Sequence, residues 1–197
     1  MKRRIVCGLF LTVAVTSGCA SSSQLLRAST ISTRSDVFQE LADGGSVPQG
    51  SADLRVVASL KTHRSDRYPS GRGTHGTPDY QLVLNIDGQV TWLRASLKEE
   101  YGEAGGMTDP EAGEGIRYRF KKDFRLKAGT YRIIVAVPED GVVVERTITL
   151  VGGSTNDLVL EPIYGIVTAR KPPAVYSRTS FLEGLRGLAM VLNGERS

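Results

Sequence analysis

A run of alternating apolar and charged side chains, from Ile116 to Leu126, constrains the fold of this chain more than any other feature. One parity of the run is apolar with a single exception, Lys122, and consists of Ile116, Tyr118, Phe120, Phe124 and Leu126. The other parity is charged and consists of Arg117, Arg119, Lys121, Asp123 and Arg125. Successive side chains of a β-strand point to opposite faces, so this pattern predicts a strand with one buried face. A slip of one residue would bury the charged row, so the register is strongly specified.

Similar apolar runs recur from Asp53 onward. They predict seven strands, which begin at residues 53, 80, 89, 116, 130, 142 and 156. Turn sequences separate these runs: Asp87-Gly88 is typical of a two-residue hairpin turn, and Pro138 to Gly141 contains another turn. Short strands with turns between them favour an all-β, antiparallel sandwich of about seven or eight strands over residues 53–197.

The C-terminal apolar segment, residues 180–192, is open to two interpretations. Ser180 and Glu183 have the spacing of a helix capping box. Against a helix, Gly184 and Gly187 would each weaken it by about 1 kcal/mol. The run also ends at Asn193-Gly194, which reads as a turn after a strand. We favour a last strand, and either structure is apolar enough to pack on the sandwich.

The N-terminus has the layout of a secretory signal. Lys2, Arg3 and Arg4 precede a mostly apolar stretch from Ile5 to Val15, and small residues follow. The apolar stretch is too short to span a bilayer as a helix. Residues 1–18 are therefore expected to be a signal peptide that is removed.

The end of this signal, Thr16-Ser17-Gly18-Cys19, resembles the signals of bacterial lipoproteins. The resemblance covers residues 1–19 and implies that Cys19 is acylated and becomes the new N-terminus. Acyl chains attach such a protein firmly to a membrane, at about 0.8 kcal/mol for each buried methylene. Ala20, where a retention signal would carry Asp, resembles lipoproteins of the outer membrane, on its periplasmic or exterior side. The alternative is an ordinary cleaved signal in which Cys19 has no special role.

Removal of the signal changes the composition that matters for function. Residues 1–18 contain three basic and no acidic residues, so the formal net charge falls from +4 to +1. A nearly neutral domain gives no reason to expect a nucleic-acid partner. Cys7 leaves with the signal and Cys19 would be acylated, so the folded part contains no thiol for a disulfide, a metal site or catalysis.

Residues 19–52 are expected to be a lipidated N-terminus followed by a flexible tether. They are mostly small and polar, and a coil of this length spans about 30 Å. One segment, residues 36–41, has the spacing of a helical turn capped by Asp36 and Gln39.

The segment from Ala128-Gly129-Thr130-Tyr131 to Leu160 resembles the PEGA and transthyretin-like β modules of bacterial surface proteins. In those modules a Gly-Thr-Tyr turn enters a strand. The resemblance implies an immunoglobulin-like or transthyretin-like sandwich and does not imply a specific activity.

The loop from residue 63 to residue 75 contains the first group of candidate site residues. It holds both histidines, His63 and His75, and three arginines, Arg64, Arg67 and Arg72. The histidines with Asp66 and Asp79 are the residue types that bind a divalent metal, but the dense spacing of known metal motifs is missing, so a solvated loop is favoured over a metal site. The arginines are suited to an anionic glycan or a phosphate.

Three further features invite a functional and a structural interpretation. The basic row Arg117, Arg119 and Lys121 could face anionic lipid, glycan or a partner, although a solvated sheet face is the simpler interpretation. The acidic loop 99–114 has oxygen ligands but lacks the phasing of a calcium loop, so a surface loop is favoured. Trp92, the only tryptophan, is expected in the core.

The sequence contains no nucleophile elbow, no P-loop and no dinucleotide fingerprint. We therefore expect a protein that is not an enzyme and needs no cofactor. The leading hypothesis is a lipid-anchored envelope protein that acts as a protein-interaction or structural module. An envelope module that binds anionic glycan or lipid is the alternative, and a metal-binding or hydrolytic protein is the third.

Overall fold

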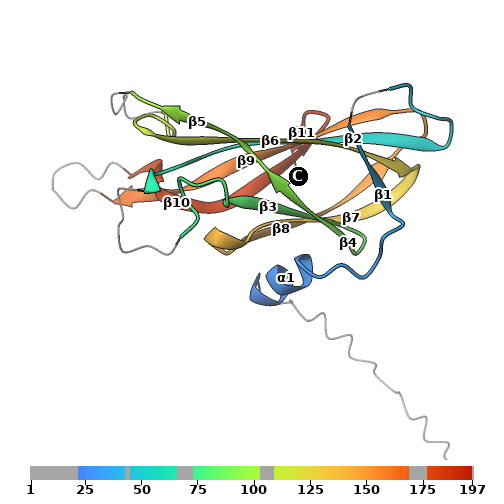
Figure 1. Ribbon diagram of the computed structural model, residues 1–197, viewed down its shortest axis with the longest axis horizontal. Coiled ribbons are helices and arrows are strands. Elements are labelled where there is room, and N and C mark those ends of the chain that lie inside the picture. The colour runs from blue at the N-terminus through green and yellow to red at the C-terminus, as the bar shows by residue number, and fades with distance from the viewer. Residues whose placement is uncertain (1–21, 43–44, 66–72, 103–108, 169–176, 197) are drawn as a thin grey trace, which may run out of the picture.

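The chain forms two β-sheets packed face to face, with the apolar core between them (Figure 1). The computed structural model describes residues 22–42, 45–65, 73–102, 109–168 and 177–196. Among these residues there are one short α-helix, α1 (Ser22–Ser29), and one 3-10 turn, η2 (Pro138–Asp140). The strands are β1 (Phe38–Leu41), β2 (Ser51–Thr62), β3 (Gln81–Ile86), β4 (Gln89–Arg94), β5 (Ser96–Glu100), β6 (Gly115–Lys127), β7 (Gly129–Val137), β8 (Val142–Leu150), β9 (Thr155–Thr168), β10 (Ser177–Leu192) and β11 (Glu195–Arg196).

Sheet A has seven strands, in the order β1-β6-β2-β9-β10-β11, with β5 also paired to β6. Sheet B has four strands in the order β4-β3-β7-β8. The expected sandwich-like, all-β architecture is confirmed, but the expectation of a purely antiparallel fold is wrong. β2 and β9 run parallel, from Asp53 opposite Thr155 to Ala58 opposite Leu160. A parallel pair needs a long crossover, and here the chain between β2 and β9 supplies it by forming β5 and β6 of sheet A and all of sheet B.

The core consists of the apolar parity that the alternation predicted. In β6, all five apolar residues are at most 5% exposed. On the neighbouring strand β2, the residues on the same face of the sheet are equally buried: Leu54, Val56, Ala58 and Leu60. Lys122, the exception in the pattern, lies where β1 joins the sheet, and its Nζ is 2.6 Å from Glu40 Oε2. The break in the alternation therefore marks an ion pair at the side of the core.

All seven predicted strands are present, and the predicted hairpin between β3 and β4 is confirmed. Ile86 pairs with Gln89 around Asp87 and Gly88, which have φ values of 45° and 90°. Two successive positive φ angles are the geometry of a type I′ turn, which strongly favours glycine at its second position.

The apolar run after this hairpin is divided between the sheets. β4 belongs to sheet B and β5 to sheet A, where Leu97 pairs with Tyr118. The expectation that Trp92 lies in the core is wrong, because Leu93 occupies the inward position at 4% exposure and Trp92 points outward from sheet B at 48%. A short strand fits either parity, and Leu93 opposite Leu82 determines which one is buried.

The C-terminal segment is a strand, as favoured from its sequence. β10 pairs with β9 along its length, with irregular register near Gly184, whose φ is 78°. Asn193 and Gly194 form the predicted turn, after which β11 pairs back with Val191 and Leu192.

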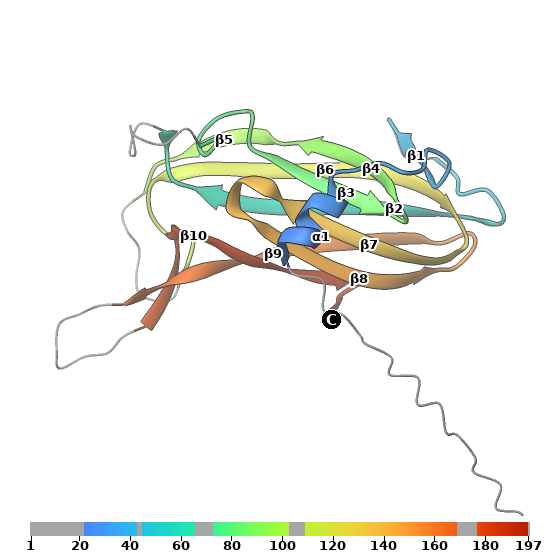
Figure 2. The same ribbon diagram turned by 90° about the horizontal axis from the view of Figure 1, so that it is seen from below.

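The N-terminal segment differs most from expectation, because part of the predicted tether is folded. α1 lies on the outer face of sheet B, as the view in Figure 2 shows. The chain then passes the β3–β4 turn, where Thr33 N donates to Gly88 O at 2.8 Å. The expected helical turn at residues 36–41 is the strand β1, which pairs with β6 and places the Phe38 ring 5.0 Å from that of Phe124.

The predicted signal peptide and Cys19 lie outside the described residues. Within the described ranges, no helix is long and apolar enough to cross a bilayer.

Candidate functional site

Two clusters of polar side chains lie side by side at one end of the sandwich, where β2, the loop after it and the β7–β8 turn meet. The first, the histidine cluster, consists of His63, His75, Tyr80 and Asp140. His75 Nδ1 is 3.0 Å from His63 Nε2, and His75 Nε2 is 3.2 Å from Asp140 Oδ1. The hydroxyl of Tyr80 donates to the other carboxylate oxygen at 2.7 Å. The cluster therefore ties the 63–75 loop to sheet B.

The geometry of the histidine cluster favours the protonated form of His75. His63 Nδ1 donates to Arg64 O at 3.0 Å, so a neutral His63 presents Nε2 as an acceptor to His75, which also donates to Asp140. Burial lowers the pKa of His75, but the hydrogen bond and negative charge of Asp140 outweigh it, and the net pKa lies above its usual value. Burial and the same carboxylate raise the pKa of the Tyr80 phenol, so Tyr80 stays protonated.

The second cluster, the lysine cluster, consists of Lys61, Glu100, Glu111, Arg117 and Tyr164. Lys61 is 4% exposed, and its Nζ donates to the carbonyls of Glu111 and Gly113 at 2.8 and 2.6 Å and contacts Glu100 Oε2 at 3.1 Å. Arg117 holds Glu100 through two hydrogen bonds, of 3.1 and 3.0 Å, and also contacts Glu111. Tyr164 donates to Glu111 at 2.7 Å and accepts from Lys61 N.

The lysine cluster is electrically balanced, with two cations against two carboxylates. The Arg117 hydrogen bonds, helped by Lys61, lower the pKa of Glu100 to about 2 despite the opposing effect of burial. Among the described residues, every buried side-chain nitrogen and oxygen has a hydrogen-bond partner. Both clusters are therefore satisfied within the chain, and their chemistry fits the anchoring of loops to the sandwich.

The structure separates the predicted site residues into engaged and exposed groups. Arg64 lies 3.4 Å from Glu99 and 3.2 Å from Glu114, with its guanidinium over the ring of Tyr101. His63 and His75 come together, as their shared loop suggested, whereas Arg67, Arg72 and Asp66 lie outside the described residues.

In the basic row of β6, Arg117 belongs to the lysine cluster, while Arg119 and Lys121 are exposed. Neither Arg119 nor Lys121 has a carboxylate within ion-pair distance among the described residues. Asp79 is exposed, and the described ranges contain no group of three or more His, Cys, Asp or Glu side chains arranged for a metal ion.

The acidic loop 99–114 is a source of counterions for the basic residues beside it. Glu99 and Glu114 pair with Arg64, and Glu100 and Glu111 pair with Arg117. Residues 103–108 of this loop lie outside the described residues. Four of the carboxylates that suggested a calcium loop thus pair with cations of the chain itself, while Asp109 accepts a hydrogen bond from Glu111 N.

A groove of about 390 Å³ on the outer face of sheet A is a site that sequence reasoning missed. Val57 of β2 and Val159 of β9 lie opposite each other in its floor. The lining also includes the segment Asp109 to Glu111, together with Glu161 and Tyr164. Val159 is 37% exposed, and Ile163, farther along the same face, is 46% exposed.

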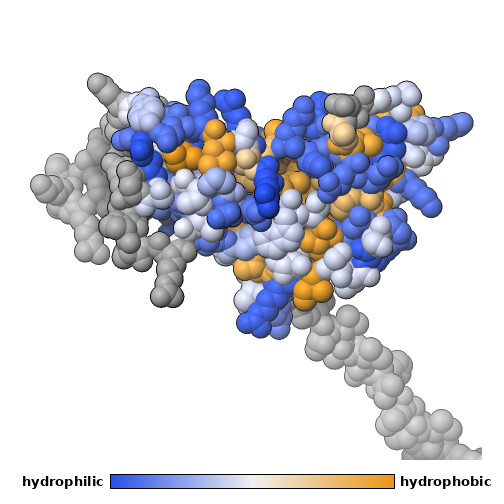
Figure 3. Space-filling view, in the orientation of Figure 1, coloured by the Kyte–Doolittle hydropathy of each residue, from blue (hydrophilic) through white to orange (hydrophobic). Residues whose placement is uncertain are grey.

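The signal for this groove was present in the sequence. Val57, Val159 and Ile163 are apolar residues on the outward parity of strands whose other outward residues are mostly polar. In the space-filling view, which shows the sandwich from the edge of its sheets, apolar side chains reach the surface among polar ones (Figure 3).

Comparison of the chain with models of known protein families, with curated proteins and with solved structures finds no match.

Proposed function

We propose that this chain is a lipid-anchored protein of the bacterial cell envelope that acts as a protein-interaction or structural module, with Cys19 as the lipidated residue. Its location is the outer membrane, on the periplasmic or exterior side. The signal layout before Cys19 supports the anchor, and the groove on sheet A is the single observation that supports an interaction role.

The groove indicates the chemistry of its partner. Its apolar floor, around Val57 and Val159, suits aliphatic side chains. The carboxylate of Asp109 in its lining suits a partner that also carries basic side chains, whereas Glu161 is already paired with Arg196. We therefore infer that the partner is an envelope protein that presents an apolar segment flanked by Lys or Arg.

A photoreactive amino acid tests this role in living cells. Benzoylphenylalanine at Val159 should crosslink to one defined envelope protein, whereas the same group at Thr147, exposed on the outer face of sheet B, should not. Equal crosslinking from both positions, or none from Val159, would argue against the groove as the interaction site.

The anchor is tested separately by Cys19→Ser. This variant should lose acylation and move from the membrane fraction to the soluble fraction, while the fold is unchanged. A Cys19→Ser variant that stays in the membrane fraction and still carries the added mass of the acyl chains would contradict lipidation at Cys19.

We also propose a relationship to immunoglobulin-like, transthyretin-like and PEGA modules. Its support is the Gly129-Thr130-Tyr131 entry into β7 and the two-sheet architecture. A related module would be expected to have the same parallel pairing as that of β2 with β9.

A second candidate function, binding of an anionic glycan or lipid, is favoured by one observation: Arg119 and Lys121 are exposed side by side on β6 without carboxylate partners among the described residues. Calorimetric titration with an acidic envelope glycan should then lose its signal in Arg119→Ala/Lys121→Ala. Substitution of Arg64, which is already paired, should change little. A third candidate, metal binding or hydrolysis, would use His63 and His75. A purified protein that carries no metal, and whose properties do not change with a chelator, would argue against metal binding.

A further inference from the structure

Helix α1 determines which side of the sandwich lies closest to Cys19. It contacts β3, β7 and β8 on the outer face of sheet B, and Ser29 at its end is completely buried. Asn85 Nδ2 contacts the carbonyls of Ala28 and Ser29, each at 3.4 Å. Three residues after Cys19 the chain reaches Ser22, so the two α-carbons are at most about 11 Å apart. An acyl group on Cys19 would therefore hold sheet B, rather than sheet A, beside the lipid.

The same face exposes side chains that suit a membrane interface. Trp92 of β4 lies opposite Val83, which lies opposite Ala136 of β7, so Trp92 is on the face that α1 covers, about 10 Å from β7. It is 48% exposed, and Ile31, just after α1, is 60% exposed. Tryptophan is enriched at the boundary between acyl chains and headgroups because its ring is apolar and its N–H is polar.

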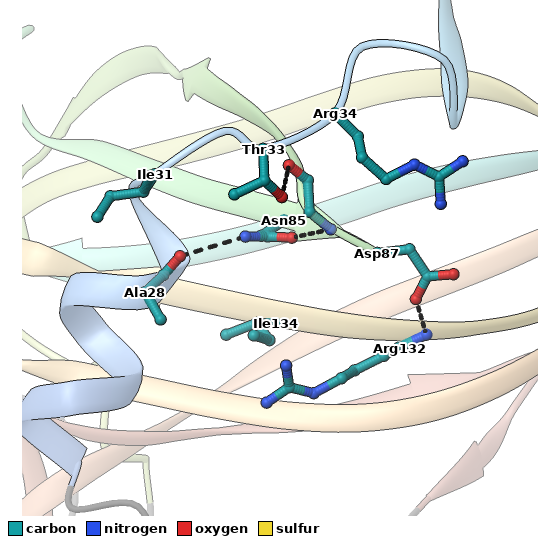
Figure 4. A pocket seen from close by; sticks show the side chains of 9 residues that line it. Ala28, Ile31, Thr33, Arg34, Asn85, Asp87, Arg132 and Ile134 are labelled. Atoms are coloured by element: carbon teal, nitrogen blue, oxygen red, sulfur yellow. Dashed lines mark hydrogen bonds between the residues drawn. The ribbon is translucent and has the colours of Figure 1, made fainter.

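A hollow of about 540 Å³ lies beside α1 on this face (Figure 4). Its apolar lining includes Ala28, Ile31 and Ile134, and Arg34 and Arg132 contribute to its border. Apolar side chains also reach the surface around α1 in Figure 3. This combination matches the depth in a bilayer at which phosphate groups meet acyl chains.

The charges on this face are only partly paired, because Arg27 of α1 and Arg94, two residues after Trp92 on β4, are exposed and have no ion pair among the described residues. Arg34 is paired with Asp36 at 3.0 Å, and Arg132 with Glu145 at 2.5 Å. Contact with a bilayer would therefore depend on apolar insertion, on the anchor and on attraction between Arg27 and Arg94 and anionic lipid, and salt would weaken only the last of the three.

We propose that the outer face of sheet B, with α1, Ile31 and Trp92, rests on the phospholipid bilayer to which Cys19 anchors the chain. The groove on sheet A is then turned away from the membrane, toward its partner. This inference rests on the proposed lipid anchor, and it assigns membrane contact to the sheet opposite the basic row of β6.

Trp92 provides the readout because it is the only tryptophan in the chain. The acylated protein is placed in vesicles of phosphatidylethanolamine and phosphatidylglycerol whose acyl chains carry bromine. The emission of Trp92 should shift to the blue, lose intensity to the bromine and be protected from aqueous acrylamide. The matched control is Trp92→Phe/Val57→Trp, whose tryptophan lies on sheet A and should keep its intensity in the same vesicles.

Vesicle flotation separates failure of the anchor from failure of the orientation. A protein that floats with the vesicles while Trp92 remains open to acrylamide and is not quenched by bromine overturns the orientation and leaves the anchor intact. A protein that does not float contradicts the proposed acylation. In that case the chain from Cys19 to Ser197, whose single thiol is Cys19, is coupled to a maleimide phospholipid, and the same quenching comparison then decides the orientation alone.

Discussion

Lys61 is the residue whose replacement tests our interpretation of the lysine cluster most directly. Its side chain is 3% exposed, and its Nζ makes two hydrogen bonds to backbone carbonyls and one ion pair with Glu100. The change Lys61→Met keeps most of the volume and the packing near the ring of Phe181, which lies 4.9 Å from Nζ. The loss should therefore be almost entirely electrostatic.

The expected cost follows from the groups left behind. Each buried carbonyl that loses its donor costs about 1–3 kcal/mol. In addition, Glu100 and Glu111 would face Arg117 alone, and breaking a buried ion pair from one side costs about 3–5 kcal/mol. Because these terms overlap, we expect a total loss of about 3–5 kcal/mol, a large part of the 5–15 kcal/mol typical of a domain.

Urea unfolding measures this loss. With a slope of about 2 kcal/mol per molar urea, the midpoint of Lys61→Met should fall by about 2 M without a change in slope. The matched control is Lys121→Met, at an exposed position on the neighbouring strand, which should stay within about 0.5 kcal/mol of the parent. Equal midpoints for the two variants would refute the argument that the cluster contributes to stability.

Three further predictions concern protonation and backbone conformation. The pKa of Glu100 in the folded state, about 2, lies below its usual 4.5. The contribution of Glu100 to stability is therefore present above pH 4.5 and is lost as the pH falls toward 2. In Glu100→Gln the urea midpoint should depend less on pH between 4.5 and 2. Because the pKa of His75 is raised in the folded state, protonated His75 stabilises the fold below pH 6.5. This stabilisation is lost as the pH rises through the folded-state pKa. An NMR titration should place that value above 6.5 and show a decrease in Asp140→Asn; no change in this variant would argue against the contact. Gly88→Ala places alanine at a φ of 90° and pushes its Cβ against Thr33 Oγ1. It should cost at least about 1–2 kcal/mol, seen as a lower Tm, whereas Gly45→Ala, with open space around it, should have the parent Tm.

The core was predictable because its signal is local. Alternation around Phe120 and Leu54 assigns an inward parity without knowledge of the neighbouring strands. The parallel pairing of β2 with β9 was not predictable in this way, because period two is the same in parallel and antiparallel sheets. Trp92 shows a related limit, since in a six-residue strand either parity can be apolar and the contact between Leu93 and Leu82 makes the choice.

The N-terminal segment was misread because its structure depends on tertiary contacts. The polar composition before β1 is that of a linker, and Phe38 lies in a strand that is held by pairing with β6, by the Gln89 side chain and by the ring of Phe124. The site was predicted in part for a similar reason. The loop suggested that His63 and His75 lie near each other, but Asp140 comes from a turn 65 residues farther along the chain from His75.

The position of β2 in sheet A has a consequence for the order in which the domain assembles. The strand completes its pairing only when β6, more than 50 residues later, and β9, about 100 residues later, are available. The strands of sheet B, by contrast, all lie between residues 81 and 150. A chain that has been synthesised only as far as β8 can therefore close sheet B, but it leaves one edge of β2 bare. Such long-range pairing slows folding to the range of milliseconds to seconds, so the larger sheet is finished last.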